Sequence, residues 1–133
     1  MLTDPGADAA DAPQVYLSGG VRTPSDALVG PLAEAAINSF RVDGTYLGVH
    51  GFDPEAGLTT PNIAEAQTNR TLIGVGAQLT VLADHTKYRE VGTNVFARMR
   101  RVDNLIVDDG LALVDRGIIE MHVGRLTIAT VQP

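Results

Sequence analysis

The sequence predicts an α/β domain with a mostly parallel, twisted sheet and flanking helices. Short β-favouring runs alternate with helical periodicity along most of the chain, an order that produces parallel sheets. The 133 residues suffice for one domain with a moderate core. A composition of 44% hydrophobic and 20% charged residues is typical of a folded globular protein. We expect one domain over residues 14–133, after a flexible tail or linker at 1–13 that mixes Asp, Ala, Gly and Pro without periodicity.

The first part of this region predicts two strands with a helix between them. A β-favouring run at 14–18 ends at Gly19-Gly20, which predicts a strand followed by a tight turn. Pro31 stands where the first turn of a helix tolerates proline, and apolar residues at helical spacing predict a helix over 31–40. Residues 44–49 predict the second strand.

A loop and a longer helix follow this second strand. Residues 50–61 have Gly and Pro at both ends, which indicates a loop. Asn62 and Glu65 have the spacing of a capping box, with asparagine in the cap position. We therefore expect a helix over 62–75.

The second half of the chain predicts two more strands and a C-terminal hairpin. Residues 79–83 and 104–107 are short β-favouring runs, each followed by a polar turn. Residues 118–121 and 126–131 flank His-Val-Gly-Arg at 122–125, a pattern that favours an antiparallel hairpin. The sheet is therefore expected to be parallel except at its C-terminal end.

Composition excludes several classes of function. With no cysteine, the chain has no disulfide scaffold, thiolate metal site or thiol nucleophile. A formal net charge of −6 argues against nucleic acid as a direct partner of this chain. No apolar run approaches the roughly 20 residues that a membrane helix needs. The acidic start, rich in small residues, is not a signal peptide, and we expect a cytoplasmic protein.

Polar residues cluster in the loops after the predicted strands, where ligands bind to parallel sheets. Gly19-Gly20 lets the backbone approach a ligand closely and leaves amides free for an anion, although most such pairs are simple turns. The run Gly57-Leu58-Thr59-Thr60 combines a glycine and two hydroxyls with a helix N-terminus just beyond it. This run could cradle an anion, or its threonines could merely cap and turn the chain.

Asp84 and Lys87 place a carboxylate and an ammonium on one short turn. Together they could hold a sugar hydroxyl and a phosphate. Lys87 is also the only lysine among ten basic residues. The alternative is a surface ion pair worth at most about 1 kcal/mol.

Other chemistries have weaker support in the sequence. His50, Asp53, Asp84 and His85 could converge on zinc or iron, since imidazole and carboxylate suit these metals, but no ligand spacing demands it. The serines have no nucleophile-elbow context, so a serine hydrolase is not expected. We predict no catalytic residue, no metal site and no cofactor.

Four segments between residues 14 and 111 stand in an order and spacing typical of one family: YLSGGVRTPSDALVGPLAE, LGVHGFDPEAGLTTPNIAEAQTNRTLI, VLADHTKY and NLIVDDGL. Together they resemble the C-terminal effector-sensing domain of DeoR-type bacterial transcriptional regulators. The resemblance implies the α/β fold shared with sugar-phosphate isomerases and coenzyme A transferases. It also implies that the domain binds a phosphorylated sugar or a similar metabolite, which changes the affinity of a repressor for operator DNA.

The resemblance also assigns residues to the ligand site. The Gly19-Gly20 turn, the segment 51–60 and the turn at 84–87 match ligand-facing motifs of the family. The residues at places similar to those around the sugar phosphate in related isomerases are Asp53, Gly57, Thr59, Asp84 and Lys87.

The chain departs from the family pattern in several places. No helix-turn-helix precedes residue 14, and the usual first strand with an Asp-x-Gly-Thr-Thr phosphate loop is missing. The resemblance therefore implies a partial sensing domain, with DNA bound only through a helix-turn-helix domain absent from this chain. His50 stands where many members have aspartate, and Asn69-Arg70 where many have lysine followed by arginine. The hairpin expected over 118–131 does not match the usual short ending of the family.

We therefore expect a ligand-sensing, non-catalytic regulatory domain that binds a small phosphorylated metabolite. One alternative is a sugar-phosphate isomerase-like enzyme, for which Asp53, Asp84 and Lys87 are the acid and base candidates. The other is an oligomerisation module or structural remnant. Because the first strands and a covering helix are missing, part of the sheet should be uncovered. We expect self-association into a homo-oligomer through that exposed edge or face.

Overall fold

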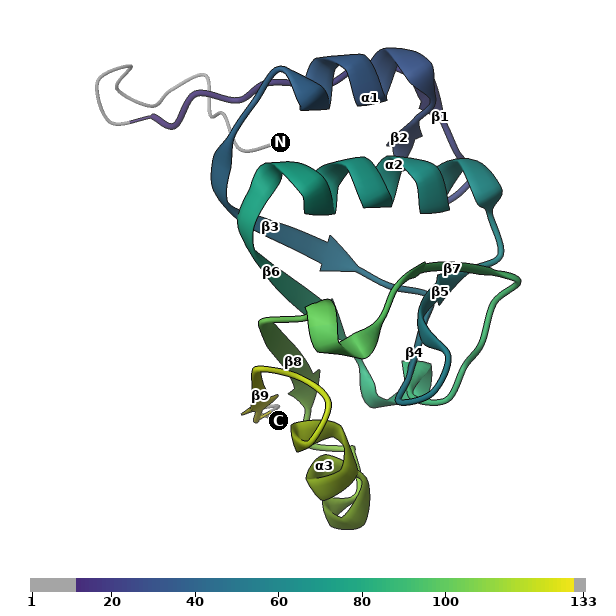
Figure 1. The fold of residues 1–133 in the computed structure, drawn as a ribbon, viewed down its shortest axis with the longest axis vertical. Helices are drawn as coiled ribbons and strands as arrows, with labels where there is room; N and C mark the ends of the chain where they lie inside the picture. The colour runs from purple at the N-terminus through teal and green to yellow at the C-terminus, as the bar shows by residue number, and fades with distance from the viewer. Residues whose placement is uncertain (1–11, 131–133) are drawn as a thin grey trace.

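A four-stranded parallel sheet forms the centre of the computed structural model, which describes residues 12–130 (Figure 1). Its strands lie in the order β3-β6-β8-β9, and each pairs with the next in parallel. Their bounds are β3 (Val42–Gly48), β6 (Gly76–Ala83), β8 (Asn104–Asp108) and β9 (Arg125–Ala129). The structure confirms the predicted α/β class with a largely parallel sheet.

Three helices connect or flank these strands. Helix α1 (Pro31–Asn38) begins at its proline as expected and ends two residues before the predicted limit. Helix α2 (Ile63–Val75) begins after the Asn62 cap, whose side-chain oxygen accepts a hydrogen bond from the Glu65 amide at 3.0 Å. Helix α3 (Leu113–Glu120) connects β8 to β9. Figure 1 shows α1 stacked on α2 at one end of the molecule and α3 at the other.

The loop predicted over 50–61 is wrong, because most of it forms two strands of a second sheet. This antiparallel sheet has the order β4-β5-β7, with bounds β4 (Gly51–Asp53), β5 (Gly57–Thr60) and β7 (Asn94–Ala97). Pro54 lies in the tight turn between β4 and β5, so the proline and glycine signals mark a hairpin rather than an open loop. All four residues of β5 are buried.

The strand predicted over 14–18 is also wrong. Those residues have no regular secondary structure, and Val15, Tyr16 and Leu17 are exposed because no described strand pairs with them. The first strands are instead β1 (Val21–Arg22) and β2 (Leu28–Val29), which form a small antiparallel hairpin. The expected tail at 1–13 lies almost wholly outside the described residues.

The C-terminal hairpin predicted over 118–131 is wrong as well. Residues 118–120 end helix α3, and β9 runs parallel to β8 rather than antiparallel to a preceding strand. A parallel pair needs a crossover connection, and α3 supplies it. The glycine that indicated a hairpin turn, Gly124, permits close packing instead, since a Cβ there would lie 2.6 Å from the Asp103 carbonyl oxygen.

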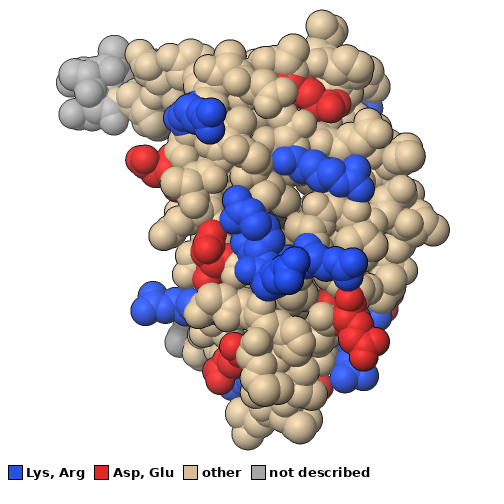
Figure 2. Space-filling model, in the orientation of Figure 1, with Lys and Arg blue, Asp and Glu red and all other residues tan. Residues whose placement is uncertain are grey.

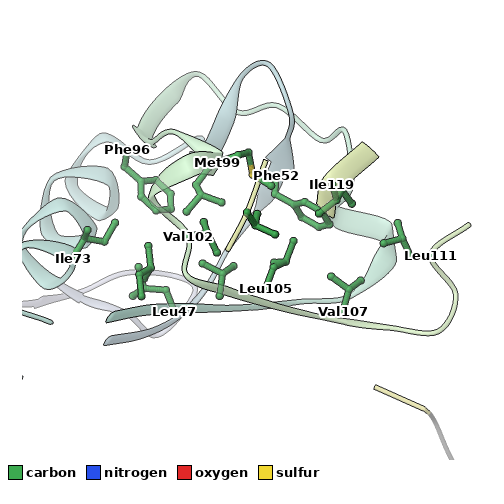
Figure 3. Close-up of a cluster of buried hydrophobic side chains, with 14 of the residues drawn as sticks. Leu47, Phe52, Ile73, Phe96, Met99, Val102, Leu105, Val107, Leu111 and Ile119 are labelled. Carbon is green, nitrogen blue, oxygen red and sulfur yellow. The ribbon is translucent and has the colours of Figure 1, made fainter. Parts of the chain in front are cut away.

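The core lies between one face of the parallel sheet and the layer packed on it. Leu47, Leu105 and Val107 point from the sheet toward Phe52 of the small sheet and Met99 of the 3-10 helix η2 (Met99–Arg101), as Figure 3 shows. Phe52 and Leu105 are fully buried. Burial of such side chains contributes about 1.5–3 kcal/mol each, so this layer fixes the strands whose ends carry the polar loops.

The opposite face of the parallel sheet is largely uncovered in the part of the chain that the structure describes. Tyr46 and Leu82 lie on this face and are 71% and 45% exposed. Strand β3 is also an edge strand, with β6 on one side only. Parallel sheets are ordinarily covered on both faces, so this face has the character of a contact surface.

Candidate ligand-binding site

Polar side chains line the end of the parallel sheet at which its strands finish. We call this end, formed by the residues just after β3, β6 and β8, the carboxyl edge. Strands β3 and β6 pair up to Gly48 and Leu82, and their continuations meet again at the bridge between Phe52 and Tyr88. Both chains leave the ladder between these two points, over residues 49–51 and 83–87. His50 therefore lies on the loop next to the one that contains Asp84 and Lys87, while its side chain faces Glu65. Strand β8 ends next to them at Asp108.

The turn after β6 is a 3-10 helix, η1 (His85–Lys87), capped by Asp84. The Asp84 carboxylate accepts hydrogen bonds from the Thr86 hydroxyl and from the Thr86 amide, the latter at 2.8 Å. These two bonds, with a smaller contribution from the Lys87 charge, hold the pKa of Asp84 below its ordinary value. Within residues 12–130, the Lys87 side chain makes no hydrogen bond or ion pair. Its ammonium is therefore available to a ligand.

Asp108, at the end of β8, is hydrogen-bonded to this turn. Its carboxylate accepts from the His85 amide at 2.6 Å and lies 2.7 Å from His85 Nδ1. The bond from the His85 amide is the main reason that the pKa of Asp108 lies below its ordinary value. Asp84, His85 and Asp108 each offer one ligand atom within 4.8 Å of the others, a spacing that a cation could use.

A buried carboxylate, Glu65 in the first turn of α2, faces His50, which follows β3. Its side chain accepts hydrogen bonds from the hydroxyls of Thr23 (3.0 Å), Ser25 and Thr60 (3.1 Å). His50 Nε2 lies 3.6 Å from Glu65 Oε2. Burial raises the pKa of Glu65, but the three hydroxyl bonds and the charge of His50 outweigh it, so the pKa lies below its ordinary value. The carboxylate is therefore ionised at neutral pH.

One group of basic side chains lies away from this edge. Figure 2 shows them gathered over the middle of one face, where η2 lies in Figure 1. Arg98, Arg100 and Arg101 belong to η2 or its cap, close to the amino end of β8. The cationic groups nearer the carboxyl edge include Lys87, Arg89 two residues after it, and Arg116, whose guanidinium donates to the carbonyls of Asp109 and Leu111 after β8.

Comparison with known proteins identifies the family. The model of the DeoR C-terminal sensor domain matches residues 7–109. The chain belongs to the DeoR sensor-domain family. Sequence similarity extends to a putative aga operon transcriptional repressor of Escherichia coli O157:H7, 30% identical over 77% of this chain and 38% of the relative. The GlpR regulator of Haloferax volcanii is 35% identical over 80% and 42%, and the AccR repressor of Agrobacterium fabrum is 31% identical over 86% and 45%.

This DeoR sensor domain spans less than half the length of these curated relatives, all of which are named as transcriptional regulators or repressors. A sensing role in regulation is therefore the function that the family indicates. No helix in the described part of the chain has both the length and the apolar character to cross a membrane.

The predicted anion cradle over residues 57–60 lies inside the small sheet of the sensor domain. The Thr59 hydroxyl accepts from the Gly92 amide at 2.8 Å, and the Thr60 hydroxyl donates to Glu65. Gly57 and Leu58 are buried in the same strand. These four residues support the fold around the edge, because their polar groups already have partners.

Asp53 and the two glycines are placed differently from Asp84 and Lys87. The Asp53 carboxylate accepts from the amides of Glu55 and Ala56 at 2.9 and 2.8 Å and so closes the β4–β5 turn. Gly19 and Gly20 precede β1 with φ values of 74° and 102°, which favour glycine. A Cβ at Gly20 would lie 2.5 Å from the Val29 carbonyl oxygen, so that glycine also permits close packing of the hairpin.

The structure does not gather the four residues of the metal alternative. His50 faces Glu65 and Asp53 closes a turn, whereas Asp84 and His85 group with Asp108. Sequence analysis missed Glu65, Thr23 and Ser25 as parts of the edge. The capping-box spacing of Glu65 was the available signal, but its carboxylate bonds the three hydroxyls, and the Asn62 amide instead donates to Thr60 Oγ1.

Proposed function

We propose that this sensor domain binds a phosphorylated sugar or a similar metabolite at the carboxyl edge of its parallel sheet. The bound ligand would control operator binding by a separate helix-turn-helix domain in a cytoplasmic, non-catalytic regulator. The observation that carries the proposal is the pairing of Lys87, whose ammonium has no described partner, with the ionised Asp84 on one turn. Ligands of parallel α/β sheets bind beyond the carboxyl ends of the strands, where this turn lies.

The two side chains have complementary tasks in this proposal. The Lys87 ammonium donates a charge-assisted hydrogen bond to a phosphate oxygen, and Asp84 accepts from a sugar hydroxyl. A hydrogen bond to a charged group contributes roughly 1.5–3 kcal/mol, which is about one to two decades in affinity. The arginines of η2 precede β8, near its amino end, whereas Lys87 follows the carboxyl end of β6.

Calorimetric titration of the chain, and of a longer regulator that contains it, with ribose 5-phosphate and glucose 6-phosphate tests this assignment. Lys87→Ala should weaken binding by about 10- to 100-fold without unfolding the domain, and Lys87→Arg should restore only part of it. Arg41→Ala is the matched control, because Arg41 precedes β3 at the opposite end of the sheet. Equal affinity of the Lys87→Ala variant and the unaltered protein would show that the site lies elsewhere.

We also propose that the chain self-associates as a homo-oligomer through the uncovered sheet face and the β3 edge. Support comes from the exposed Tyr46 and Leu82 side chains and from the free edge of β3. Light scattering should detect a species larger than one chain, and Tyr46→Lys should shift it toward the monomer. A strictly monomeric protein at high concentration contradicts this proposal.

A further inference from the structure

We propose that strand β9 and helix α3 form an interface with a second copy of this chain, in which the two β9 strands pair antiparallel about a twofold axis. In this dimer the two parallel sheets join into one continuous sheet, and the two α3 helices pack against each other on one face of it. The interface lies at the opposite side of the sheet from β3. It goes beyond the proposed function because it assigns a separate surface and the partner that this surface fits.

The first support is the free edge of β9. Within residues 12–130, β9 pairs with β8 on one side and with no strand on the other. Its register with β8 is regular throughout, and its sequence, RLTIA, contains no proline and only one charged residue, at its first position. Edge strands that are protected from pairing carry bulges, prolines or several charges. Strand β9 lacks these features and can therefore accept a further strand.

The second support is incomplete burial along that edge. Leu126 and Ile128 point from β9 toward the core and pack against it, yet both are only half-buried. Their neighbours on β8, Leu105 and Val107, are almost completely buried. A strand added beyond β9 covers the open side of Leu126 and Ile128 and so completes the core at this edge.

The third support is an apolar stripe on α3. Leu113, Gly117 and Met121 lie at positions i, i+4 and i+8, so they share one face of the helix and its C-cap. Leu113 and Met121 are each 77% exposed. Ile119, on the opposite face, is fully buried and points into the core (Figure 3). The stripe therefore faces away from the core, although its side chains are apolar.

The stripe lies on the side of α3 that is nearer to the free edge of β9. At the end of α3, His122 lines a hollow together with Pro54 and Arg98, so the β4–β5 turn and η2 border the other side of the helix. No described strand follows β9 in the sheet. The apolar stripe and the free edge of β9 thus form one continuous surface.

The fourth support is the spacing that the twofold axis imposes. Helix α3 connects β8 to β9 and packs against β9, and such a crossover helix lies over the gap between its two strands. Since strands lie about 4.8 Å apart, α3 is half a spacing inside β9 and the axis half a spacing outside it. The two helices are then about 10 Å apart, which is the distance of packed helices. A Cβ at Gly117 would meet no atom within 4 Å, so the second helix has room to approach there.

The fifth support is the charge on the uncovered face of the sheet. Arg125 is exposed at the start of β9 and forms no ion pair among residues 12–130. When Thr127 lies on the axis, every residue of β9 pairs, and Arg125 stands opposite Ala129 of the other copy. Because Ala129 pairs with Asp108, each arginine lies two strand spacings, about 10 Å, from an acidic residue of the other copy. The dimer thus brings opposite charges to the same face of the joint sheet.

Disulfide cross-linking tests this arrangement, because the chain has no cysteine of its own. Residues that face each other in an antiparallel pair have Cα atoms about 4.5–5.5 Å apart, a distance that a disulfide can bridge. Thr127→Cys should therefore oxidise to a covalent dimer about tenfold faster than Thr93→Cys, because association raises the local concentration of the thiol. Thr93 is the matched control, since it is an exposed threonine outside the strands. Equal rates overturn the pairing of β9 about Thr127.

Sedimentation tests the contact between the helices, with circular dichroism as the check on folding. Leu113→Lys places a charge in the apolar stripe and should weaken dimer formation by about tenfold. Leu32→Lys is the matched control, because Leu32 is an equally exposed leucine in the first turn of α1. An unchanged dissociation constant in Leu113→Lys overturns the interface.

The Tyr46→Lys variant separates this interface from the self-association proposed at β3. Because Tyr46 lies away from β9, the variant should still form a dimer and should still cross-link through Thr127→Cys. Addition of Leu113→Lys should then give the monomer. A Tyr46→Lys variant that is already monomeric overturns the β9 interface and leaves the proposal at β3 standing.

Discussion

Two carboxylates at the carboxyl edge of the sheet, Glu65 and Asp108, show how burial changes the role of one chemical group. Glu65 is buried and joins Thr23, Ser25 and Thr60, the first two of which lie 42 and 40 residues away in the sequence. Asp108 is partly exposed and bonds the adjacent turn through His85 and Gly110. The buried carboxylate connects distant segments around the site, whereas the partly exposed carboxylate connects only the adjacent turns.

The pKa values of both carboxyls are lowered, yet the balance of causes differs. At Glu65, burial raises the pKa and is the largest single influence, and only the combined hydroxyl bonds with the His50 charge reverse it. At Asp108, a single amide bond from His85 is the largest influence. Removing the partners of Glu65 therefore leaves a buried charge without compensation, which is costly, whereas water can replace the partners of Asp108.

The largest expected effect is the loss of stability in Glu65→Ala. This change leaves three hydroxyls without their acceptor, two of them, those of Thr23 and Thr60, on buried residues, and should lower the free energy of unfolding by roughly 2–4 kcal/mol. Thermal unfolding followed by circular dichroism should show a drop of about 10 °C. Glu120→Ala at the exposed end of α3 is the matched control. Asp108→Ala should shift the midpoint much less than Glu65→Ala, and equal shifts would contradict the comparison.

The elements that sequence analysis predicted well depend on local signals. Helix α2 follows from the Asn62 cap and helical spacing, and it begins and ends within a residue of the prediction. The strands β6 and β8 and the polar turns after them also follow from short apolar runs, and they placed Asp84 and Lys87 at the carboxyl edge. Such patterns depend only on residues close together in the sequence, so the elements that they predict do not depend on distant contacts.

The elements that it missed depend on distant partners. Whether the run at 126–131 pairs in parallel or antiparallel is decided by β8, about twenty residues earlier, and by the α3 crossover. Two of the three hydroxyls around Glu65, those of Thr23 and Ser25, come from the β1–β2 connection, which has no pattern that points to a helix 40 residues later. The buried half of the site was therefore not predictable from spacing.

The smallest expected effect is a pH dependence of stability that belongs to Glu65. Because its folded-state pKa lies below the ordinary value, the ionised carboxylate contributes stability that is present at neutral pH. This contribution is lost as the pH falls below about 5 and through the lowered folded-state value. The stability difference between the unaltered protein and Glu65→Gln should therefore be largest at neutral pH and should narrow on acidification.

Urea unfolding of both proteins over a series of pH values measures this difference. Every other carboxyl titrates in both proteins, so subtraction isolates the part that depends on Glu65. The same series with Glu120→Gln, at an exposed glutamate, is the matched control. If the Glu65→Gln difference instead widens as the pH falls, burial outweighs the hydroxyl bonds and the carboxyl is protonated more easily in the folded state. The pKa of the buried Glu65 would then be raised, whereas the pKa of the partly exposed Asp108 is lowered. The two carboxyls would differ in the direction of their pKa shifts as well as in the causes.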